Sequence, residues 1–251
     1  MTPVVHVDIR ERIATITLDS PSNRNALSQQ LLDELADHLA TAGRDPGVGG
    51  VMLTATGTTF CSGADLKNPP RPDSGGVTLP AVMTMIWEFP KPVVIKLNGH
   101  VRAGGTGLVA AADIVVAPTS ATFAFTEVRI GVSPAIISVL CVRRMASRAL
   151  SRYCLTGEAF DARAAEACGL VTLAVEPGQL DPVTAELLAA IRLTEPNAVG
   201  ITKRLLRELP TRDISDGFAE AEAISAALFA SEAAAEGMLA FREKRPPKWA
   251  R

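Results

Sequence analysis

The segment Phe60-Cys61-Ser62-Gly63-Ala64-Asp65-Leu66 places a glycine turn shortly after an apolar run at 51–55, which predicts a buried strand. A second glycine turn, Ala103-Gly104-Gly105, follows the apolar run at 93–97 and precedes a helical pattern at 108–112. We expect each turn to lie between a strand and a helix. Glycine permits positive φ and close backbone approach, and a helix start leaves N–H groups unpaired. The two turns therefore predict a site where two backbone amides face one anionic oxygen.

The residues before the first turn predict a β-β-α unit. Alternating apolar and polar residues at 4–9 and 13–18 predict a hairpin. Ser28 is placed to cap a following helix in which apolar residues recur with a period of 3.6. That apolar face consists of Leu31, Leu32, Leu35, Ala36 and Leu39.

Beyond this unit, strand-to-helix patterns start again at Val51, Val93 and Ile114. From Ile137 the pattern is mainly helical, apart from one short strand near 171–175. Residues 213–241 predict two more helices. Periodicity alone thus gives an α/β fold with a helical C-terminal end.

Composition limits the classes of partner. The chain has 251 residues and a net charge of −2, so nothing attracts it electrostatically to nucleic acid or to an anionic membrane. Neither a basic leader nor an apolar run of about 20 residues occurs, and we expect a cytoplasmic protein without membrane insertion. The four cysteines show no CxxC spacing, which predicts buried free thiols and no metal site.

Three motifs together resemble the enoyl-CoA hydratase/isomerase (crotonase) superfamily: residues 60–66, Asn98-Gly99 with Gly104-Gly105, and Asn23-Arg24-Asn25-Ala26-Leu27-Ser28. Their order and spacing fit the superfamily across nearly the whole chain. The resemblance implies a spiral of β-β-α units, with a core at 1–195. It also implies a helical region at 196–251 that joins subunits into a homotrimer or a hexamer made of two trimers.

The resemblance also implies an acyl-CoA thioester as substrate and no separate cofactor. The backbone amides of Ala64 and Gly104 would form an oxyanion hole for the thioester carbonyl, and Glu127 would be the catalytic acid/base. The flanking Phe123 and Phe125 are apolar, which favours a partly buried carboxylate at Glu127. The alternative is a surface glutamate that pairs with Arg129.

The sequence departs from the family pattern at Gly107, where hydratases usually carry the first of two glutamates. Two carboxylates can divide the acid and base roles. Glu127 alone can move a proton between two carbons, which is isomerisation, or can support water addition with help from another side chain. The sequence is most similar to a methylglutaconyl-CoA hydratase-like branch that also tends to carry glycine there, which makes a branched or carboxylated enoyl-CoA a candidate substrate.

Two residues near the second turn are candidates to assist Glu127 or the substrate. His100 is either a structural loop residue or a replacement for the missing glutamate. Arg102 stands where the family is expected to have a small or apolar residue, and it is either solvated or binds an acidic acyl tail.

The CoA-binding residues come from three segments. By resemblance, the substrate-binding set is Arg24, Ala26, Leu27, Ser62, Asp65, Leu66, Gly105, Phe241 and Lys244. The last two match a C-terminal pattern that approaches the CoA of a neighbouring subunit, and the alternative for Lys244 is a solvated terminal charge. The helix expected after Thr78 offers Leu79 and Met83 either to an acyl pocket or to the core.

Other classes of protein fit less well. Residues 105–110 satisfy a relaxed dinucleotide fingerprint, but the preceding segment is too long for the usual turn and no clear acidic partner follows. Ser62 lacks the frame of a hydrolase nucleophile. A CoA-ester-binding protein with little turnover remains the non-enzymatic alternative. The sequence therefore predicts a hydratase-type lyase, with a Δ3,Δ2-enoyl-CoA isomerase as the enzymatic alternative.

Overall fold

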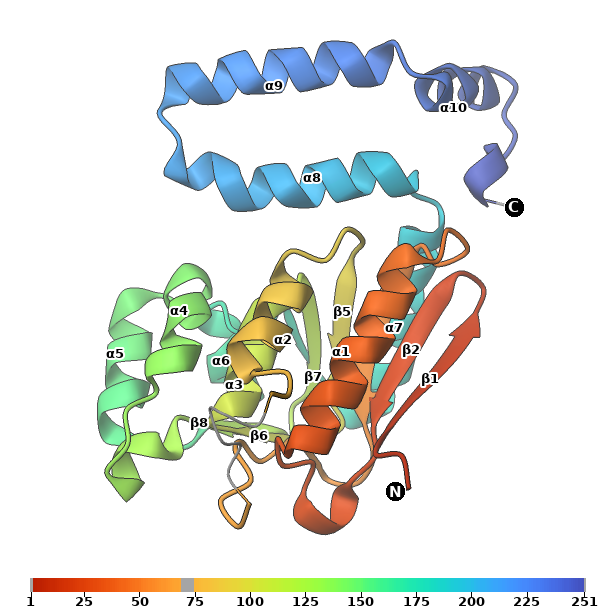
Figure 1. The fold of residues 1–251 in the computed structure, drawn as a ribbon. Coiled ribbons are helices and arrows are strands. Elements are labelled where there is room, and N and C mark those ends of the chain that lie inside the picture. Colours follow the sequence, from red (N-terminus) through yellow and green to blue (C-terminus); the bar gives the residue numbers. More distant parts are fainter. Residues whose placement is uncertain (1, 69–74, 251) are drawn as a thin grey trace.

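Within residues 2–68 and 75–250, which the computed structural model describes, the chain forms two sheets, surrounding helices and a C-terminal helical arm (Figure 1). The strands are β1 (Val5–Arg10), β2 (Ile13–Leu18), β3 (Gly50–Ala55), β4 (Thr59–Cys61), β5 (Val93–Lys96), β6 (His100–Arg102), β7 (Ile114–Pro118), β8 (Thr122–Ala124), β9 (Phe160–Asp161) and β10 (Leu173–Val175). The α-helices are α1 (Gln29–Arg44), α2 (Leu79–Trp87), α3 (Gly104–Ala111), α4 (Ala135–Arg144), α5 (Ser147–Thr156), α6 (Ala162–Ala167), α7 (Leu180–Arg192), α8 (Pro196–Glu208), α9 (Ile214–Phe229) and α10 (Glu232–Arg242). Short 3-10 helices are η1 (Pro21–Asn23), η2 (Thr126–Ile130), η3 (Pro177–Gln179), η4 (Leu209–Thr211) and η5 (Lys248–Ala250).

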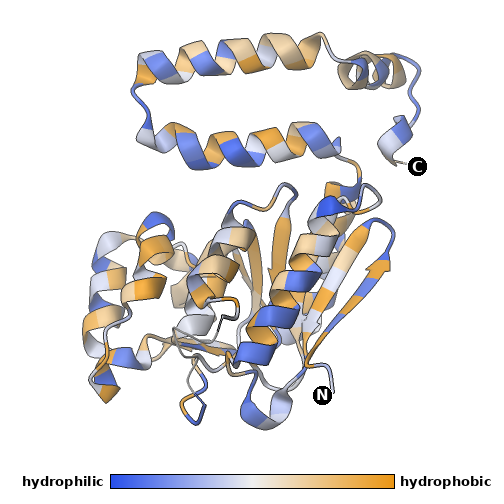
Figure 2. Cartoon of the chain, viewed as in Figure 1, coloured by the Kyte–Doolittle hydropathy of each residue, from blue (hydrophilic) through white to orange (hydrophobic). Residues whose placement is uncertain are grey.

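The large sheet has the strand order β1-β2-β3-β5-β7-β10. The β1–β2 hairpin is antiparallel and the other pairs are parallel. Val93 and Ile95 pack into the main core with α1, α2 and α3, whereas Val94 packs with Ile191 of α7 on the other face. Successive side chains of a β-strand point to opposite faces, which explains this alternation. Figure 2 shows hydrophobic residues concentrated on the strands of the large sheet. The predicted hairpin and the strands at Val51, Val93 and Ile114 are confirmed.

The first long helix forms as its sequence predicts. The Ser28 hydroxyl accepts a hydrogen bond from the Leu31 amide and so caps the start of α1. All five residues of the predicted apolar face are buried against the sheet.

The small sheet has the order β4-β6-β8-β9. Each of its parallel strands follows a strand of the large sheet after a few residues: β3 leads to β4, β5 to β6, and β7 to β8. This repetition gives the β-β-α units that were expected.

The small sheet corrects two sequence predictions about the glycine turns. Strand β6 lies between the 93–97 strand and the second turn, so β5 does not lead directly into that turn. No helix immediately follows the first turn: residues 64–68 are non-helical, and the next described helix is α2, from Leu79. The expected strand-turn-helix order therefore holds only for the second turn, with β6 as its strand.

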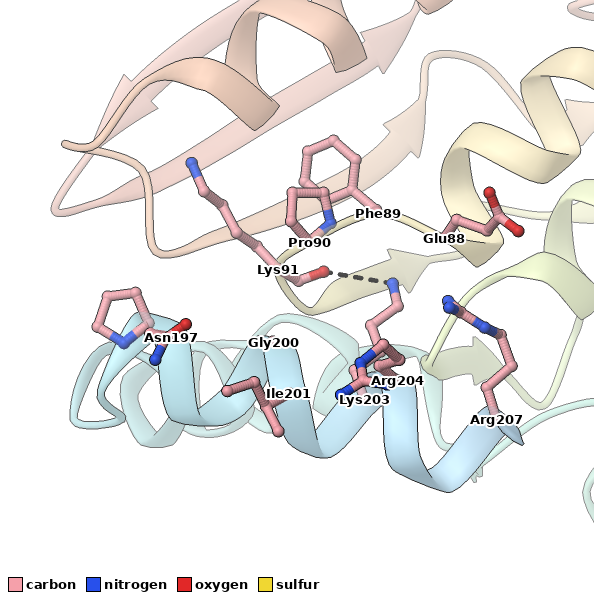
Figure 3. Close-up of a pocket in the computed structure, with 11 residues that line it drawn as sticks. Glu88, Phe89, Pro90, Lys91, Asn197, Gly200, Ile201, Lys203, Arg204 and Arg207 are labelled. Atoms are coloured by element: carbon pink, nitrogen blue, oxygen red, sulfur yellow. Dashed lines mark hydrogen bonds between the residues drawn. The ribbon is translucent and has the colours of Figure 1, made fainter. Parts of the chain in front are cut away.

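Helix α8 joins the arm to the N-terminal edge of β5 and β7. Lys203 Nζ lies 2.7 Å from Asp113 Oδ2 and also donates to the carbonyls of Ile86 and Lys91. Figure 3 shows this side chain reaching across to Lys91 beside a cavity of about 420 Å³. Burial lowers the pKa of Lys203, and the neighbouring Asp113 opposes that shift.

The arm beyond α8 exposes large apolar side chains along α9 and α10. Phe218, Phe229 and Phe241 are 67%, 71% and 86% exposed. No single helix in the described ranges is long and apolar enough to span a membrane, although α9 and α10 pass that test together as a pair bent by 66°. Helices α9 and α10 confirm the two helices that the sequence predicts within residues 213–241.

We expect Lys203→Met to lower the free energy of unfolding by on the order of 3 kcal/mol, because it leaves the Asp113 carboxylate without its buried cation. Lys96→Met is the matched control, since its partner Asp181 is 81% exposed, and it should cost less than about 1 kcal/mol. Urea unfolding of both variants measures the difference. Equal losses would show that the buried pair does not anchor α8.

Candidate active site

Three site segments leave the same edge of the small sheet. Strands β4, β6 and β8 are parallel, with Cys61 paired to Val101 and Val101 paired to Phe123. The two glycine turns and Glu127 follow these strands directly, so they emerge together at the carboxyl ends. Sequence reasoning missed this sheet, although it placed the residues that the sheet brings together.

The first turn is held by a neighbouring segment. The Leu27 amide donates to the Gly63 carbonyl at 2.8 Å, and the Ser62 amide donates to the Arg24 carbonyl at 3.1 Å. Gly63 has a φ of 91°, and a Cβ built there would lie 2.8 Å from Ala103 Cβ. Only glycine therefore fits between the two turns without moving one of them. Ala64, the next residue, is exposed.

The second turn starts helix α3 from a constrained residue. Ala103 has a φ of 47° and a ψ of −121°, which an alanine adopts only at a cost of about 1–3 kcal/mol. Its amide donates to the Ala124 carbonyl, and its own carbonyl accepts from Thr106. These bonds hold Gly104 at the first position of α3, where the partial positive charge of the helix lies.

The amides of Ala64 and Gly104 are free for a ligand. In the part of the chain that the structure describes, neither N–H donates to another protein group. A Cβ at Gly104 would meet Leu27 Cδ1 at 2.7 Å and Leu79 Cδ2 at 3.2 Å, so apolar side chains line this position. A further tight contact occurs at Gly105, where a Cβ would lie 2.8 Å from that of Cys61. The arrangement can stabilise an oxyanion.

Glu127 lies in η2 as a half-buried carboxylate. Its Oε2 atom is buried and has no hydrogen-bond partner among the described residues. Burial raises the pKa of Glu127 above its ordinary 4.5, and one backbone hydrogen bond partly opposes the shift. Arg129 instead donates to the Thr156 carbonyl, so the alternative of a Glu127–Arg129 surface pair is wrong. A raised pKa makes this carboxylate a better proton acceptor than a solvated glutamate, which suits a role in proton transfer.

The side-chain space at Gly107 is already filled. A Cβ built there would lie 2.6 Å from Ile137 Cγ2 and 2.9 Å from Met83 Sδ. A glutamate at this position would therefore require both neighbours to move. The wall of the site contributed by α2 and α4 is apolar where the family pattern has its first carboxylate.

His100 and Arg102 tie β6 to β8. The Arg102 guanidinium donates to the carbonyls of Val101 and Thr122 and to the Thr122 hydroxyl, and burial lowers its pKa. His100 Nδ1 accepts from the Thr122 amide at 3.2 Å. The structure thus gives both residues a place in the sheet, and Arg102 is half-buried rather than solvated.

The predicted CoA-binding residues fall into two groups. Arg24 is exposed beside the first turn, while Ala26 and Leu27 are buried under it. Ser62 and Asp65 are half-buried and Leu66 is 72% exposed, all adjacent to Ala64. The structure therefore brings this group together around the glycine turns.

Phe241 and Lys244 lie elsewhere. Phe241 lies in the last turn of α10 and Lys244 just after that helix, in the arm, which Figure 1 shows at the opposite end of the molecule from β6 and β8. One protomer does not bring them to its own glycine turns. Their predicted approach to the CoA of a neighbouring subunit stays a prediction.

No group of three or more potential metal ligands lies close together in the described ranges. Cavities of about 420 and 510 Å³ flank α8, and no predicted site residue lines them.

Comparisons with known proteins identify the family of the chain. A sequence profile described as enoyl-CoA hydratase/isomerase matches residues 8–251. The chain is 35% identical to a provisionally named enoyl-CoA hydratase of Thermus thermophilus, over 94% of this chain and 97% of that one. It is 30% identical to the 2,3-dehydroadipyl-CoA hydratase of Escherichia coli, over 96% of each chain. The crystal structure of an enoyl-CoA hydratase of Mycobacterium smegmatis superposes with a TM-score of 0.90 at 30% identity, covering 100% of both chains.

We expect Gly63→Ala to lower the free energy of unfolding by about 1–3 kcal/mol, because the new Cβ meets Ala103 and the backbone keeps a positive φ. Gly178→Ala is the control: a Cβ there meets nothing within 4 Å, and its cost should stay within about 0.5 kcal/mol. Thermal and urea unfolding measure both. A neutral Gly63→Ala would show that the two turns do not need this contact.

Glu127 should make stability depend on pH. Its raised pKa means that the folded protein binds this proton more tightly than the unfolded chain does. The contribution to stability is therefore fully present below about pH 4.5 and is lost as the pH rises through the folded pKa. Glu127→Gln should then gain stability relative to the wild type as the pH rises from below 4.5 to 7, with the pH-dependent difference vanishing only below pH 4.5. Urea titrations at both pH values test this, and a constant difference would contradict the raised pKa.

Proposed function

Because the chain belongs to the enoyl-CoA hydratase/isomerase family, we propose that it is a hydratase-type lyase that adds water to a 2-enoyl-CoA thioester. The observation that carries the proposal is the common edge of β4, β6 and β8, from which two free amides and one half-buried carboxylate emerge. No metal or redox group is part of the proposal. The CoA is part of the substrate.

The proposed reaction uses Glu127 first as a base and then as an acid. Its carboxylate takes a proton from water while the oxygen of that water bonds to C3 of the enoyl group. The C2–C3 π electrons move to the thioester, and the resulting enolate oxygen accepts hydrogen bonds from the Ala64 and Gly104 amides. Protonated Glu127 then returns the proton to C2, so one water is added overall. A raised pKa suits both halves of this cycle.

Isomerisation is the second candidate, and the filled space at Gly107 favours it. With Ile137 and Met83 in that space, no second glutamate holds the attacking water. Glu127 would instead take a proton from C2 of a 3-enoyl thioester and return it to C4. The same oxyanion hole serves both reactions, because both pass through an enolate.

The substrate's CoA moiety would lie along the segments at 24–27 and 62–66. Their backbones are already joined by hydrogen bonds next to Ala64. Phe241 and Lys244 would complete this site from a neighbouring subunit of a homotrimer or hexamer. The exposed phenylalanines of α9 and α10 support such an assembly, and sedimentation analysis measures it.

We expect Glu127→Gln to lower kcat by about 10²–10⁴-fold on the reactive thioester, because the amide can neither accept nor donate the transferred proton. Purified protein would be incubated with 2-enoyl-, 3-enoyl- and 3-methylglutaconyl-CoA, and products followed by mass spectrometry. Glu186→Gln, an exposed glutamate of α7, is the control and should leave the rate unchanged.

The products separate the candidates. A mass gain of one water establishes the hydratase, and a double-bond shift without added mass establishes the isomerase. Thioester binding with neither product would contradict both and support a binding protein. Turnover that survives Glu127→Gln would remove Glu127 from the mechanism.

A further inference from the structure

One backbone carbonyl connects the three segments that build the site. The Thr56 carbonyl lies between β3 and β4 and accepts hydrogen bonds from Asn25 Nδ2 at 3.0 Å and from Asn98 Nδ2 at 3.2 Å. Asn25 lies within the segment beside the first turn, and Asn98 lies between β5 and β6. The three residues are far apart in sequence, so this contact exists only in the folded chain.

The Asn25 side chain makes more hydrogen bonds than that of Asn98. It is fully buried, at 0% exposure. Nδ2 also donates to the Thr59 carbonyl at 2.8 Å, and Oδ1 accepts from the Ser20 amide at 2.7 Å. The residue has a φ of 51°, a left-handed conformation that asparagine tolerates better than most residues. One buried side chain thus ties the proposed CoA segment and the preceding Ser20 to both ends of the turn that enters β4.

Asn98 holds the start of β6, the strand that leads to the second turn, to the same point. Its Nδ2 also donates to the Gly57 carbonyl at 2.7 Å. Its Oδ1 is buried and has no hydrogen-bond partner within the described residues. Leaving such an atom unpaired costs about 1–3 kcal/mol. The neighbouring Gly99 allows the backbones to approach, because a Cβ there would lie 1.9 Å from the Thr58 carbonyl oxygen.

From these contacts we infer that Asn25 and Asn98 are positioning residues that couple the CoA segment to the oxyanion hole through the Thr56 carbonyl. Binding energy from a CoA moiety along residues 24–27 would reach Ala64 through the hydrogen bonds of that segment to Ser62 and Gly63, and Gly104 through β6, which follows Asn98. The inference rests on the proposed function for the identity of the ligand. On this view, the hydrogen bonds to the Thr56 carbonyl affect how strongly the substrate's thioester carbonyl is polarised. They do not act through the affinity for CoA or through folding alone.

The test uses 4-dimethylaminocinnamoyl-CoA, whose absorption moves to the red when hydrogen bonds polarise its thioester carbonyl. This probe reports on the oxyanion hole without turnover. Asn25→Gly keeps the left-handed backbone but loses the side-chain bonds. We expect it to reduce the red shift by at least half, and to lower kcat on the active substrate about 10- to 100-fold, while the affinity for free CoA changes less than threefold.

A substrate pair tests the coupling itself. The wild type should prefer the CoA ester over the matching N-acetylcysteamine thioester in kcat, because remote binding energy is used at the reacting carbon. Asn25→Gly should shrink that preference about tenfold or more. Should Asn25→Gly fail to fold, Asn98→Ala carries the same expectation for both measurements, since it removes the other half of the bridge.

Thr54→Val is the matched control. Thr54 is also buried close to the bridge, but its hydroxyl donates to the Lys96 carbonyl at 2.9 Å, within the large sheet, and not to the Thr56 carbonyl. It should lose stability yet keep the full red shift and the CoA preference. If Asn25→Gly and Asn98→Ala behave like Thr54→Val, the inference is wrong while the proposed function stands. If the wild type gives no red shift, the oxyanion hole and the inference both fail.

Discussion

The contact between Gly63 and the start of α3 is the constraint on which the rest of the site depends. Two amides can face one oxygen only if their backbones come closer than any side chain permits, and a Cβ at Gly63 would lie 3.4 Å from the Gly104 nitrogen. The small sheet supplies that approach by running β4 and β6 in parallel, so that both turns leave one edge. The unfavourable backbone of Ala103 persists because its amide and carbonyl are both hydrogen-bonded to neighbours. Site geometry here is a property of backbone packing, and side chains mainly avoid obstructing it.

The periodicity of the sequence predicted most of the fold. It did not predict the small sheet, and the reason is physical. The hairpin, α1 and the strands at Val51, Val93 and Ile114 have clear repeats over six or more residues or a strongly apolar run. Strands β4, β6 and β8 have three residues each, too few for a repeat to show, and their pairing partners are distant in sequence. The wrong expectation of a helix directly after the first turn has the same origin. Asn23–Ser28, by contrast, has no repeat but carried the resemblance, and the structure places it against that turn.

The sequence predicted the residues of the candidate site but not the small sheet that brings them together. The family resemblance supplies Glu127, and its apolar flanks predict a partly buried carboxylate, which agrees with its half-buried position. The roles of Ala64, Gly104 and Glu127 remain proposals that rest on their common edge. The bridge at Thr56 could not be foreseen, since an asparagine signals a turn equally well whether its amide is buried or solvated.

The environment of Glu127 suits it to act alone in the proposed reaction, where the pattern expected from the resemblance has two glutamates. A pair of glutamates stays chemically distinct only when their surroundings separate their pKa values. Here the side-chain space at Gly107, the position of the other glutamate in the family pattern, is filled by Ile137 and Met83. Desolvation raises the pKa of Glu127, so its acid and base forms are closer in free energy at neutral pH than those of a solvated glutamate. A group in that condition can take and return a proton within one cycle, which is the requirement that both candidate reactions share.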